Sequence, residues 1–222
     1  MTSGCGILRK KKGSCRRSAF SLSNTTKDKV QVLLFAGIQK MNEHPRLEDI
    51  FRQIKCPKEF QDTVDKILTV ENRKIIAKEE KFCFFGTGRT NDFPSEVILF
   101  LIFQSKKYPR FCCMAQDYII LGFSADKWNV YKAELEHDFS ADMDKLEICS
   151  HYVTAGNEHH GIGSAGVQKI ISLARMLKCK EIWGKAESYL DETEEGRERL
   201  RNFYKKNGFV FEENDIYFSM EL

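Results

Sequence analysis

Two glycines in the middle of the chain join a strand pattern to a helix pattern. The strand pattern ends at Val153, a polar stretch follows, and Gly161 and Gly163 come two residues apart just before the helix. The apolar residues of that helix share one face: Val167, Ile170, Ile171, Ala174 and Leu177. A helix start presents unpaired N–H groups at its positive end, and glycine lets an anion approach the backbone. The segment therefore predicts either a pyrophosphate site or a tight turn.

The segments around this loop predict a mixed α/β sheet. Before the loop, strands are expected at Arg110–Ala115, Tyr118–Phe123, Val130–Leu135 and Leu146–Val153, with breaks at 116–117, 124–126 and 138–144. Their short connections favour an antiparallel meander. After the loop we expect a helix near Gly163–Leu177, a strand Glu181–Ala186, a helix near Gly196–Lys206, and strands Phe209–Phe211 and Ile216–Leu222.

The N-terminal third has a different composition. Residues 1–27 hold seven Lys or Arg and no acid, which predicts a disordered basic tail, with a transit peptide or a weak contact with phosphate-rich partners as alternatives. Residues 28–80 predict a helical extension of two or three helices, and residues 81–222 form the remaining domain. At its start, Phe82–Phe85 predicts a short strand ending at 86–88, whereas Val97–Phe103 fits either a helix capped by Asp92 or a buried strand.

Charge, apolar runs and cysteine spacing argue against several classes of protein. A formal net charge of +3 is small for a dedicated nucleic-acid binder. The longest apolar run, Val97–Phe103, is far shorter than the roughly 18 residues needed to cross a membrane. The eight cysteines lack the paired spacing of zinc sites, so we expect reduced thiols, no metal and a cytoplasmic protein. The glycine loop matches neither a P-loop nor the three-glycine dinucleotide fingerprint.

A second motif lies near the C-terminus, in residues 203–209, which read Phe-Tyr-Lys-Lys-Asn-Gly-Phe. It predicts a helix end capped by Gly208 that runs directly into a strand. The order of strand, Gly-Ile-Gly-Ser loop, helix, strand and this motif resembles the GNAT superfamily of acetyltransferases, over roughly residues 110–222. The resemblance implies a GNAT-like acyl-CoA N-acyltransferase fold with a helical extension. It also implies transfer of acetyl from acetyl-CoA, by direct attack, to a primary amine of a small molecule or protein.

The resemblance also assigns the cofactor-binding residues. The backbone of Val153 is expected to hold the thioester arm of acetyl-CoA. The loop amides of Gly161, Ile162, Gly163, Ser164 and Ala165 are expected to hold the pyrophosphate. Two positions depart from the family pattern: Glu158 falls where Arg or Gln is usual, and Arg197 where asparagine is frequent. His159 or His160 is expected to supply a partly positive donor instead, or to be a solvated loop residue.

Three residues are candidates for catalysis. The family pattern makes Tyr204 the acid that protonates the coenzyme A sulfur, the alternative being a packing role. It also makes Glu147 the base, the alternative being a solvated strand start. Strict alternation places Glu147, Cys149, His151 and Val153 on one face of the strand, and Leu146, Ile148, Ser150 and Tyr152 on the other. His151 on the Glu147 face is then expected to act through water.

Two other functions stay open at this point. A catalytically weak or inactive relative would be an interaction module that binds coenzyme A or a partner, which Glu158 and Arg197 make conceivable. Alternatively, the basic tail and helices form a nucleic-acid or ribosome adaptor, although aromatic residues are sparse there. The expected partners are acetyl-CoA and an amine acceptor of unknown identity, with no membrane; the sequence leaves a homodimer open.

Overall fold

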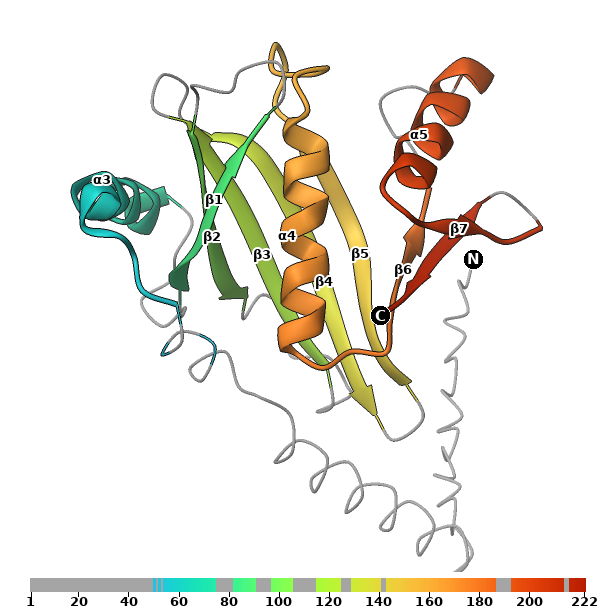
Figure 1. The fold of residues 1–222 in the computed structure, drawn as a ribbon, viewed down its shortest axis with the longest axis horizontal. Helices are drawn as coiled ribbons and strands as arrows, with labels where there is room; N and C mark the ends of the chain where they lie inside the picture. The colour runs from blue at the N-terminus through green and yellow to red at the C-terminus, as the bar shows by residue number, and fades with distance from the viewer. Residues whose placement is uncertain are drawn as a thin grey trace, which may run out of the picture.

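The computed structural model of the chain describes residues 50, 52, 54–74, 82–90, 97–105, 115–124, 129–140, 143–186, 193–213 and 216–222. Within these ranges lie three helices: α3 (Lys58–Lys74), α4 (Ile162–Met176) and α5 (Glu194–Lys206). The strands are β1 (Phe82–Arg89), β2 (Val97–Ser105), β3 (Ala115–Ser124), β4 (Asn129–Ser140), β5 (Met143–Val153), β6 (Glu181–Lys185), β7 (Val210–Phe211) and β8 (Tyr217–Glu221). Figure 1 shows them as one twisted sheet with helices packed on it.

The sheet has the order β1-β2-β3-β4-β5-β6-β8-β7. Strands β1 to β5 form an antiparallel meander, and β5 pairs with β6 in parallel. A parallel pair needs a crossover, which α4 supplies between the two strands. The predicted mixed α/β sheet, its meander and the helix after the glycine loop are therefore confirmed.

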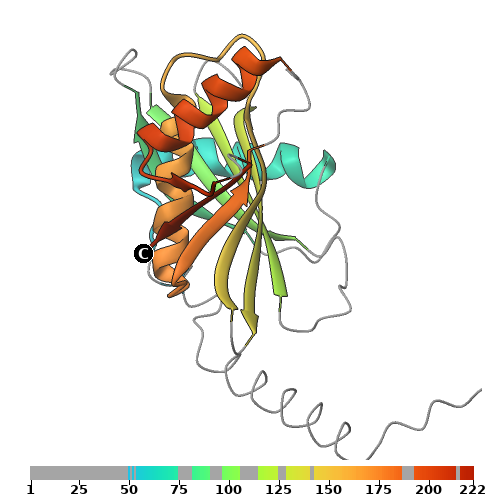
Figure 2. The ribbon, with the colours of Figure 1, turned by 90° about the vertical axis from the view of Figure 1, so that its right-hand side faces the viewer.

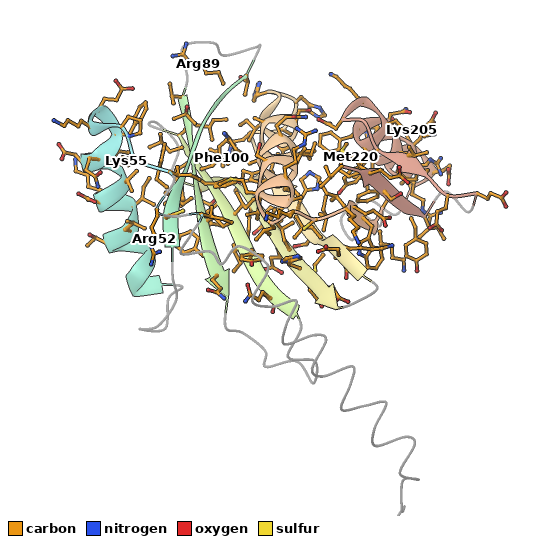
Figure 3. All side chains as sticks on the ribbon, turned by 60° about the horizontal axis from the view of Figure 1, so that its bottom comes forward. Arg52, Lys55, Arg89, Phe100, Lys205 and Met220 are labelled. Carbon is orange, nitrogen blue, oxygen red and sulfur yellow. The ribbon has the colours of Figure 1, made fainter. Side chains whose placement is uncertain are left out.

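Two apolar layers cover opposite faces of the sheet. Residues of β2 alternate between them: Ile98, Phe100 and Ile102 belong to the layer under α4, whereas Leu99, Leu101 and Phe103 belong to the layer that includes Val64 and Ile67 of α3. Figure 3 shows α3 and α4 on either side of β2, with Phe100 labelled on the α4 side, and Figure 2 shows α3 passing behind the strands. The first seven residues of β2, Val97–Phe103, are apolar because both faces of the strand are covered there.

This double cover explains why one of two expectations for Val97–Phe103 is wrong. The segment is a strand and not a helix. The strand expected to end at Gly86–Gly88 also continues, as β1, to Arg89, with a bulge between Phe84 and Gly86. A Cβ at Gly88 would lie 2.8 Å from the Phe100 ring, so this glycine makes room for a packed ring instead of a turn.

Of the predicted breaks between strands, the one at 116–117 is wrong and the one at 138–144 is shorter than expected. Residues 116–117 lie inside β3, where Gln116 accepts a 2.6 Å hydrogen bond from the Tyr118 hydroxyl. The polar stretch 138–144 belongs mostly to β4 and β5, because β4 extends to Ser140 and β5 begins at Met143. A strand can contain polar side chains where one face of the sheet is not covered by other elements. The expectations for residues 1–49, 91–94 and 110–114 lie outside the described residues.

The cysteines and the helices add two further findings. The four described cysteines, Cys56, Cys83, Cys149 and Cys179, are free thiols; the other four lie outside the described residues.

In the part of the chain that the structure describes, no helix combines the length and apolar content that crossing a membrane requires.

Helix α4 depends on a glycine at its closest approach to the sheet. A Cβ at Gly166 would lie 2.2 Å from the ring of Tyr131, which is fully buried. Glycine to alanine inside a helix is normally favourable. Here we expect Gly166→Ala to lower the free energy of unfolding by about 1–3 kcal/mol, through overpacking.

Chemical denaturation of Gly166→Ala beside Ser172→Ala tests this expectation. Ser172 is exposed on the same helix, so its replacement should leave the midpoint of unfolding unchanged or slightly raised. A Gly166→Ala protein as stable as the wild type would contradict the packing of α4 on Tyr131.

Candidate functional site

An extra residue in β5 decides which side chains face α4. In the pairing of β4 with β5, Leu135 lies opposite Ile148 and Glu134 opposite Ser150, which leaves Cys149 as the inserted residue of a β-bulge. The insertion shifts the alternation by one. His151 and Val153 therefore lie on the same face as Ile148, toward α4 and α5, and not on the face of Glu147.

Glu147 is consequently not where strict alternation expects it. Its carboxylate lies with Glu136 and the thiol of Cys149, with one polar atom of each within 4.8 Å of the others. Glu136 is its cross-strand neighbour on β4, and Leu146 and Ile148 on either side are buried under α4. The expected common face of Glu147 and His151 is wrong, and the base role of Glu147 stays a prediction without support from the geometry.

The end of β5 has backbone groups that face a gap. Strand β6 pairs with β5 only from Lys145 to Ile148, and Figure 1 shows the two strands diverging beyond that point. The amide of Thr154 donates to the carbonyl of Val130 on β4, at 3.1 Å. Because successive residues of a strand point their N–H and C=O groups to opposite sides, the backbone groups of Val153 and His151 point away from β4. They are thus directed into the gap between β5 and β6.

The glycine loop leads from this gap to the start of α4. Gly161 is the N-cap in a left-handed conformation with φ of 76°, and the first helical bond runs from the Ala165 amide to the Gly161 carbonyl, at 3.0 Å. No side chain caps the helix start and the first turn holds no acid. The amides of Ile162, Gly163 and Ser164 precede the first intrahelical donor, the Ala165 amide, and lie at the positive end of the helix.

A pocket of about 440 Å³ joins the gap to the helix start. It is lined by His151, Tyr152, Val153, Glu158, His159, Gly161, Gly163, Ser164, Leu200, Phe203 and Lys206. Five of the eight expected cofactor-binding residues are among them. Of the other three, His160 and Ala165 are half-buried and Ile162 is buried in the core, so the side chain of Ile162 is not a candidate; the Ala165 amide already donates to the Gly161 carbonyl. A Cβ at Gly163 would lie 3.2 Å from the Phe203 ring, which shows how closely α5 approaches the loop.

Two charged residues of opposite sign lie at this pocket. Glu158 is fully exposed, and its own backbone amide is the main cause that lowers the pKa of its carboxyl group, so it carries a negative charge at neutral pH. Lys206 comes from the last turn of α5 and forms no ion pair with any residue that the structure describes. Sequence reasoning did not single out Lys206, although it belongs to the C-terminal motif.

His151 and Tyr204 form a buried pair beside the pocket. The Tyr204 hydroxyl lies 3.0 Å from His151 Nδ1, and Tyr204 is only 4% exposed. The His151 ring stacks on Phe203, with centroids 5.3 Å apart, and Tyr204 stacks on Phe218 at 3.8 Å. Burial lowers the pKa of His151 to about 4 and raises the pKa of Tyr204. His151 lines the pocket, whereas Tyr204 lies behind it.

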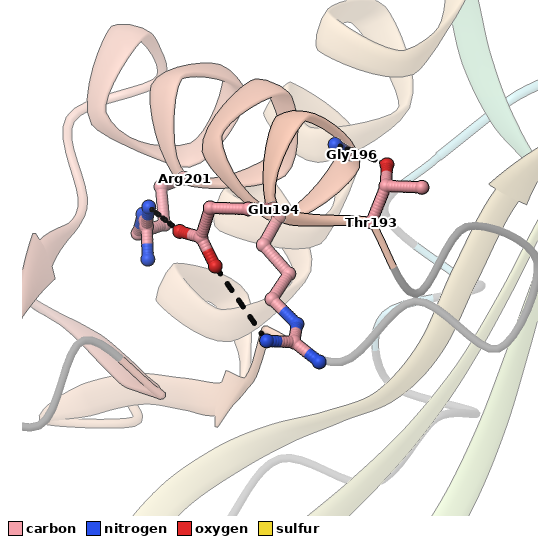
Figure 4. Close-up of polar contacts among 5 residues, drawn as sticks. Thr193, Glu194, Gly196 and Arg201 are labelled. Atoms are coloured by element: carbon pink, nitrogen blue, oxygen red, sulfur yellow. Dashed lines mark hydrogen bonds and ion pairs between the residues drawn. The ribbon is translucent and has the colours of Figure 1, made fainter.

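Arg197 lies away from the pocket. Its helix, α5, begins at Thr193, whose hydroxyl accepts from the Gly196 amide at 3.1 Å. The Arg197 guanidinium pairs with Glu194 at 3.5 Å, and Glu194 also pairs with Arg201 at 2.8 Å (Figure 4). Arg197 is exposed and is not among the residues that line the pocket.

Comparison with known proteins gives structural neighbours only. No family model and no curated protein sequence matches the chain. Solved structures that it is similar to include acetyltransferases. One is the PaiA N-acetyltransferase of Thermoplasma acidophilum in complex with coenzyme A, with 20% identity, a TM-score of 0.37, and coverage of 47% of this chain and 60% of that one.

Two others are a GNAT-family acetyltransferase of Listeria monocytogenes and a spermidine N-acetyltransferase of Vibrio cholerae. The first has 13% identity, a TM-score of 0.36, and coverage of 47% of this chain and 64% of that one. The second has 12% identity, a TM-score of 0.38, and coverage of 50% and 66%. TM-scores below 0.5 carry no argument about activity, so the function has to rest on the residues of this chain.

Proposed function

We propose that this chain is an acyl-CoA-dependent N-acyltransferase of the GNAT superfamily, which transfers acetyl from acetyl-CoA to a primary amine. The observation that carries the proposal is the convergence of three features on one pocket. These are the backbone at the end of β5, beyond the residues that pair with β6, the start of α4 without a side-chain cap, and the buried pair of His151 and Tyr204. An elongated anion that ends in a thioester fits this combination.

In the proposal, two parts of acetyl-CoA are assigned to groups of the pocket: the amide-bearing arm and the pyrophosphate. In the proposal, the backbone groups of Val153 bind the amide-bearing arm, because amide groups pair with strand backbone as another strand would. The amides of Gly163 and its neighbours in the first turn bind the pyrophosphate, together with Lys206, which lines the same pocket. His159 lines the same pocket and is the nearer of the two loop histidines.

The chemistry requires an amine, an acyl carbon and a place for one proton. The lone pair of a neutral amine forms the N–C bond, and the C–S bond then breaks with its electron pair on sulfur. The proton that the amine loses ends on that sulfur, so coenzyme A leaves as a thiol. The resemblance names Tyr204 as the acid, but its hydroxyl lies 3.0 Å from His151 Nδ1 and it does not line the pocket, so in the proposal Tyr204 acts through His151 and not on the sulfur directly.

The experiment that tests the activity measures release of free coenzyme A thiol from acetyl-CoA. The full chain is assayed against a panel of primary amines that includes a polyamine, an aminoglycoside and lysine-containing peptides. We expect at least one amine to raise thiol release above the hydrolysis seen without it. Binding of acetyl-CoA without any amine-dependent release, over the whole panel, would contradict the proposal.

One observation favours a second candidate function. Glu158 is an ionised carboxylate on the pocket that is proposed to hold phosphates, and like charges repel. A pocket weakened in this way suits an interaction module that binds coenzyme A loosely or not at all. Replacement of Glu158 by glutamine separates the two functions, since only the enzyme gains tighter acetyl-CoA binding together with faster thiol release at low acetyl-CoA concentration.

A further inference from the structure

Among the described residues, the buried hydroxyl of Tyr204 has one hydrogen-bond partner. Its ring is enclosed by Phe203, Phe209 and Phe218, and within the described residues its only hydrogen bond is to His151 Nδ1. A buried O–H group needs an acceptor, because an unsatisfied donor costs free energy in an apolar surrounding. The Tyr204 hydroxyl therefore donates, and Nδ1 accepts.

This direction fixes where the proton of His151 lies. A neutral imidazole carries one N–H, so an accepting Nδ1 places the proton on Nε2. His151 is neutral at physiological pH, because burial among the rings of Tyr131, Phe203 and Tyr204 lowers its pKa to about 4. His151 is thus a hydrogen-bond donor through Nε2, and it is not a base at that atom.

Nε2 is also the nitrogen that reaches the pocket. Nδ1 is directed at Tyr204, which does not line the pocket, whereas His151 does. Nε2 forms no hydrogen bond with any residue that the structure describes. It is also not one of the polar atoms that are fully buried without a partner, so it is accessible from the pocket. An accessible N–H on the pocket wall, next to the gap at the end of β5, follows from these two facts.

We propose that His151 Nε2–H donates a hydrogen bond to the carbonyl oxygen of the bound thioester, and that Tyr204 is a positioning residue that fixes the tautomer and the ring. The inference rests on the proposed acyltransferase function and names a residue for it. As the amine forms the N–C bond, the C=O electron pair moves onto oxygen; when C=O re-forms, the C–S bond breaks and its pair leaves on sulfur. His151 stabilises the transient negative oxygen and keeps its proton throughout.

The tautomer can be observed without any assay of activity. The full chain is labelled with ¹⁵N-histidine, and its long-range ¹H–¹⁵N spectrum is recorded at pH 7, with His151→Gln to assign the His151 signals. We expect the neutral Nε2–H form in the wild type and a mixture of both tautomers in Tyr204→Phe, with the backbone amide spectrum of that variant otherwise unchanged. A protonated His151, or the Nδ1–H form in the wild type, would overturn the proposal.

A titration with acetyl-CoA in the same spectra separates this proposal from the proposed function. We expect acetyl-CoA to shift the Nε2 and Hε2 signals of His151. If acetyl-CoA shifts the amides of the glycine loop and leaves the His151 side chain unchanged, His151 is not the donor although the binding function stands. If acetyl-CoA shifts no signal at all, the proposed function fails and the donor role fails with it, while the tautomer result still reports on the pair itself.

Discussion

Gly163→Glu is expected to weaken acetyl-CoA binding by roughly 100-fold, which equals about 2.8 kcal/mol. The new carboxylate would stand in the first turn of α4, where the pyrophosphate is proposed to accept hydrogen bonds from the backbone. It would fill pocket space and repel the phosphates at the same time. The helix itself should form, because an acid in the first turn stabilises it. Calorimetric titration with acetyl-CoA measures the change.

Gln168→Glu is the matched control, since it adds the same charge to the same helix at an exposed position that does not line the pocket. We expect its affinity for acetyl-CoA to stay within about twofold of the wild type, since an exposed charge beyond the first turn is largely screened. Equal loss of affinity in both variants would mean that net charge, and not the pocket at the start of α4, determines binding.

Tyr204→Phe is expected to lower kcat by about 10- to 100-fold while the affinity for acetyl-CoA changes little. The variant removes only the hydroxyl that holds His151 Nδ1, and it keeps the ring that stacks on Phe218. Since Tyr204 does not line the pocket, binding of the donor should not depend on it. Steady-state kinetics with the best amine, together with titration of acetyl-CoA, give both quantities.

Tyr118→Phe provides the comparison for this experiment. Tyr118 is also buried and its hydroxyl also makes one side-chain hydrogen bond, to Gln116, but it lies outside the pocket. Both variants lose a buried hydroxyl, so their losses of stability should be similar, at about 1 kcal/mol. Only Tyr204→Phe should lose turnover. A similar fall of kcat in Tyr118→Phe would reduce the role of Tyr204 to a contribution to stability.

The loop and α4 were predictable from the sequence because the signals for them are local. The strand end at Val153, the left-handed turn at Gly161 and the apolar face of the helix all lie within one short segment. The predicted helix, 163–177, differs from α4 by one residue at each end. A local rule was sufficient here, since the same residues that mark the helix start also shape the site.

The faces of β5 were not predictable in the same way. The alternation rule holds only while the strand contains no extra residue, and the bulge at Cys149 arises from pairing with β4. No residue type in the segment 147–151 marks it, since neither glycine nor proline is present. One inserted residue was enough to move His151 to the pocket side of the sheet and to leave Glu147 on the other side.

The partnership of His151 with Tyr204 also lay beyond the sequence pattern. Both residues were singled out separately, but they are 53 positions apart and come from β5 and α5. Their contact depends on the packing of α5 against β8, through the stacking of Tyr204 on Phe218. Long-range contacts of this kind are set by the tertiary structure, on which a single sequence carries little information.

The measurement that tests the central claim most directly is a calorimetric titration of the full chain with acetyl-CoA, with dephospho-CoA and ATP as comparators. The account predicts saturable binding in the micromolar range, with acetyl-CoA bound more tightly than ATP, because ATP lacks the arm that would pair with the backbone at the end of β5. No heat and no thermal shift with acetyl-CoA would contradict the account, and would leave the pocket at the start of α4 as a structural feature of an interaction module.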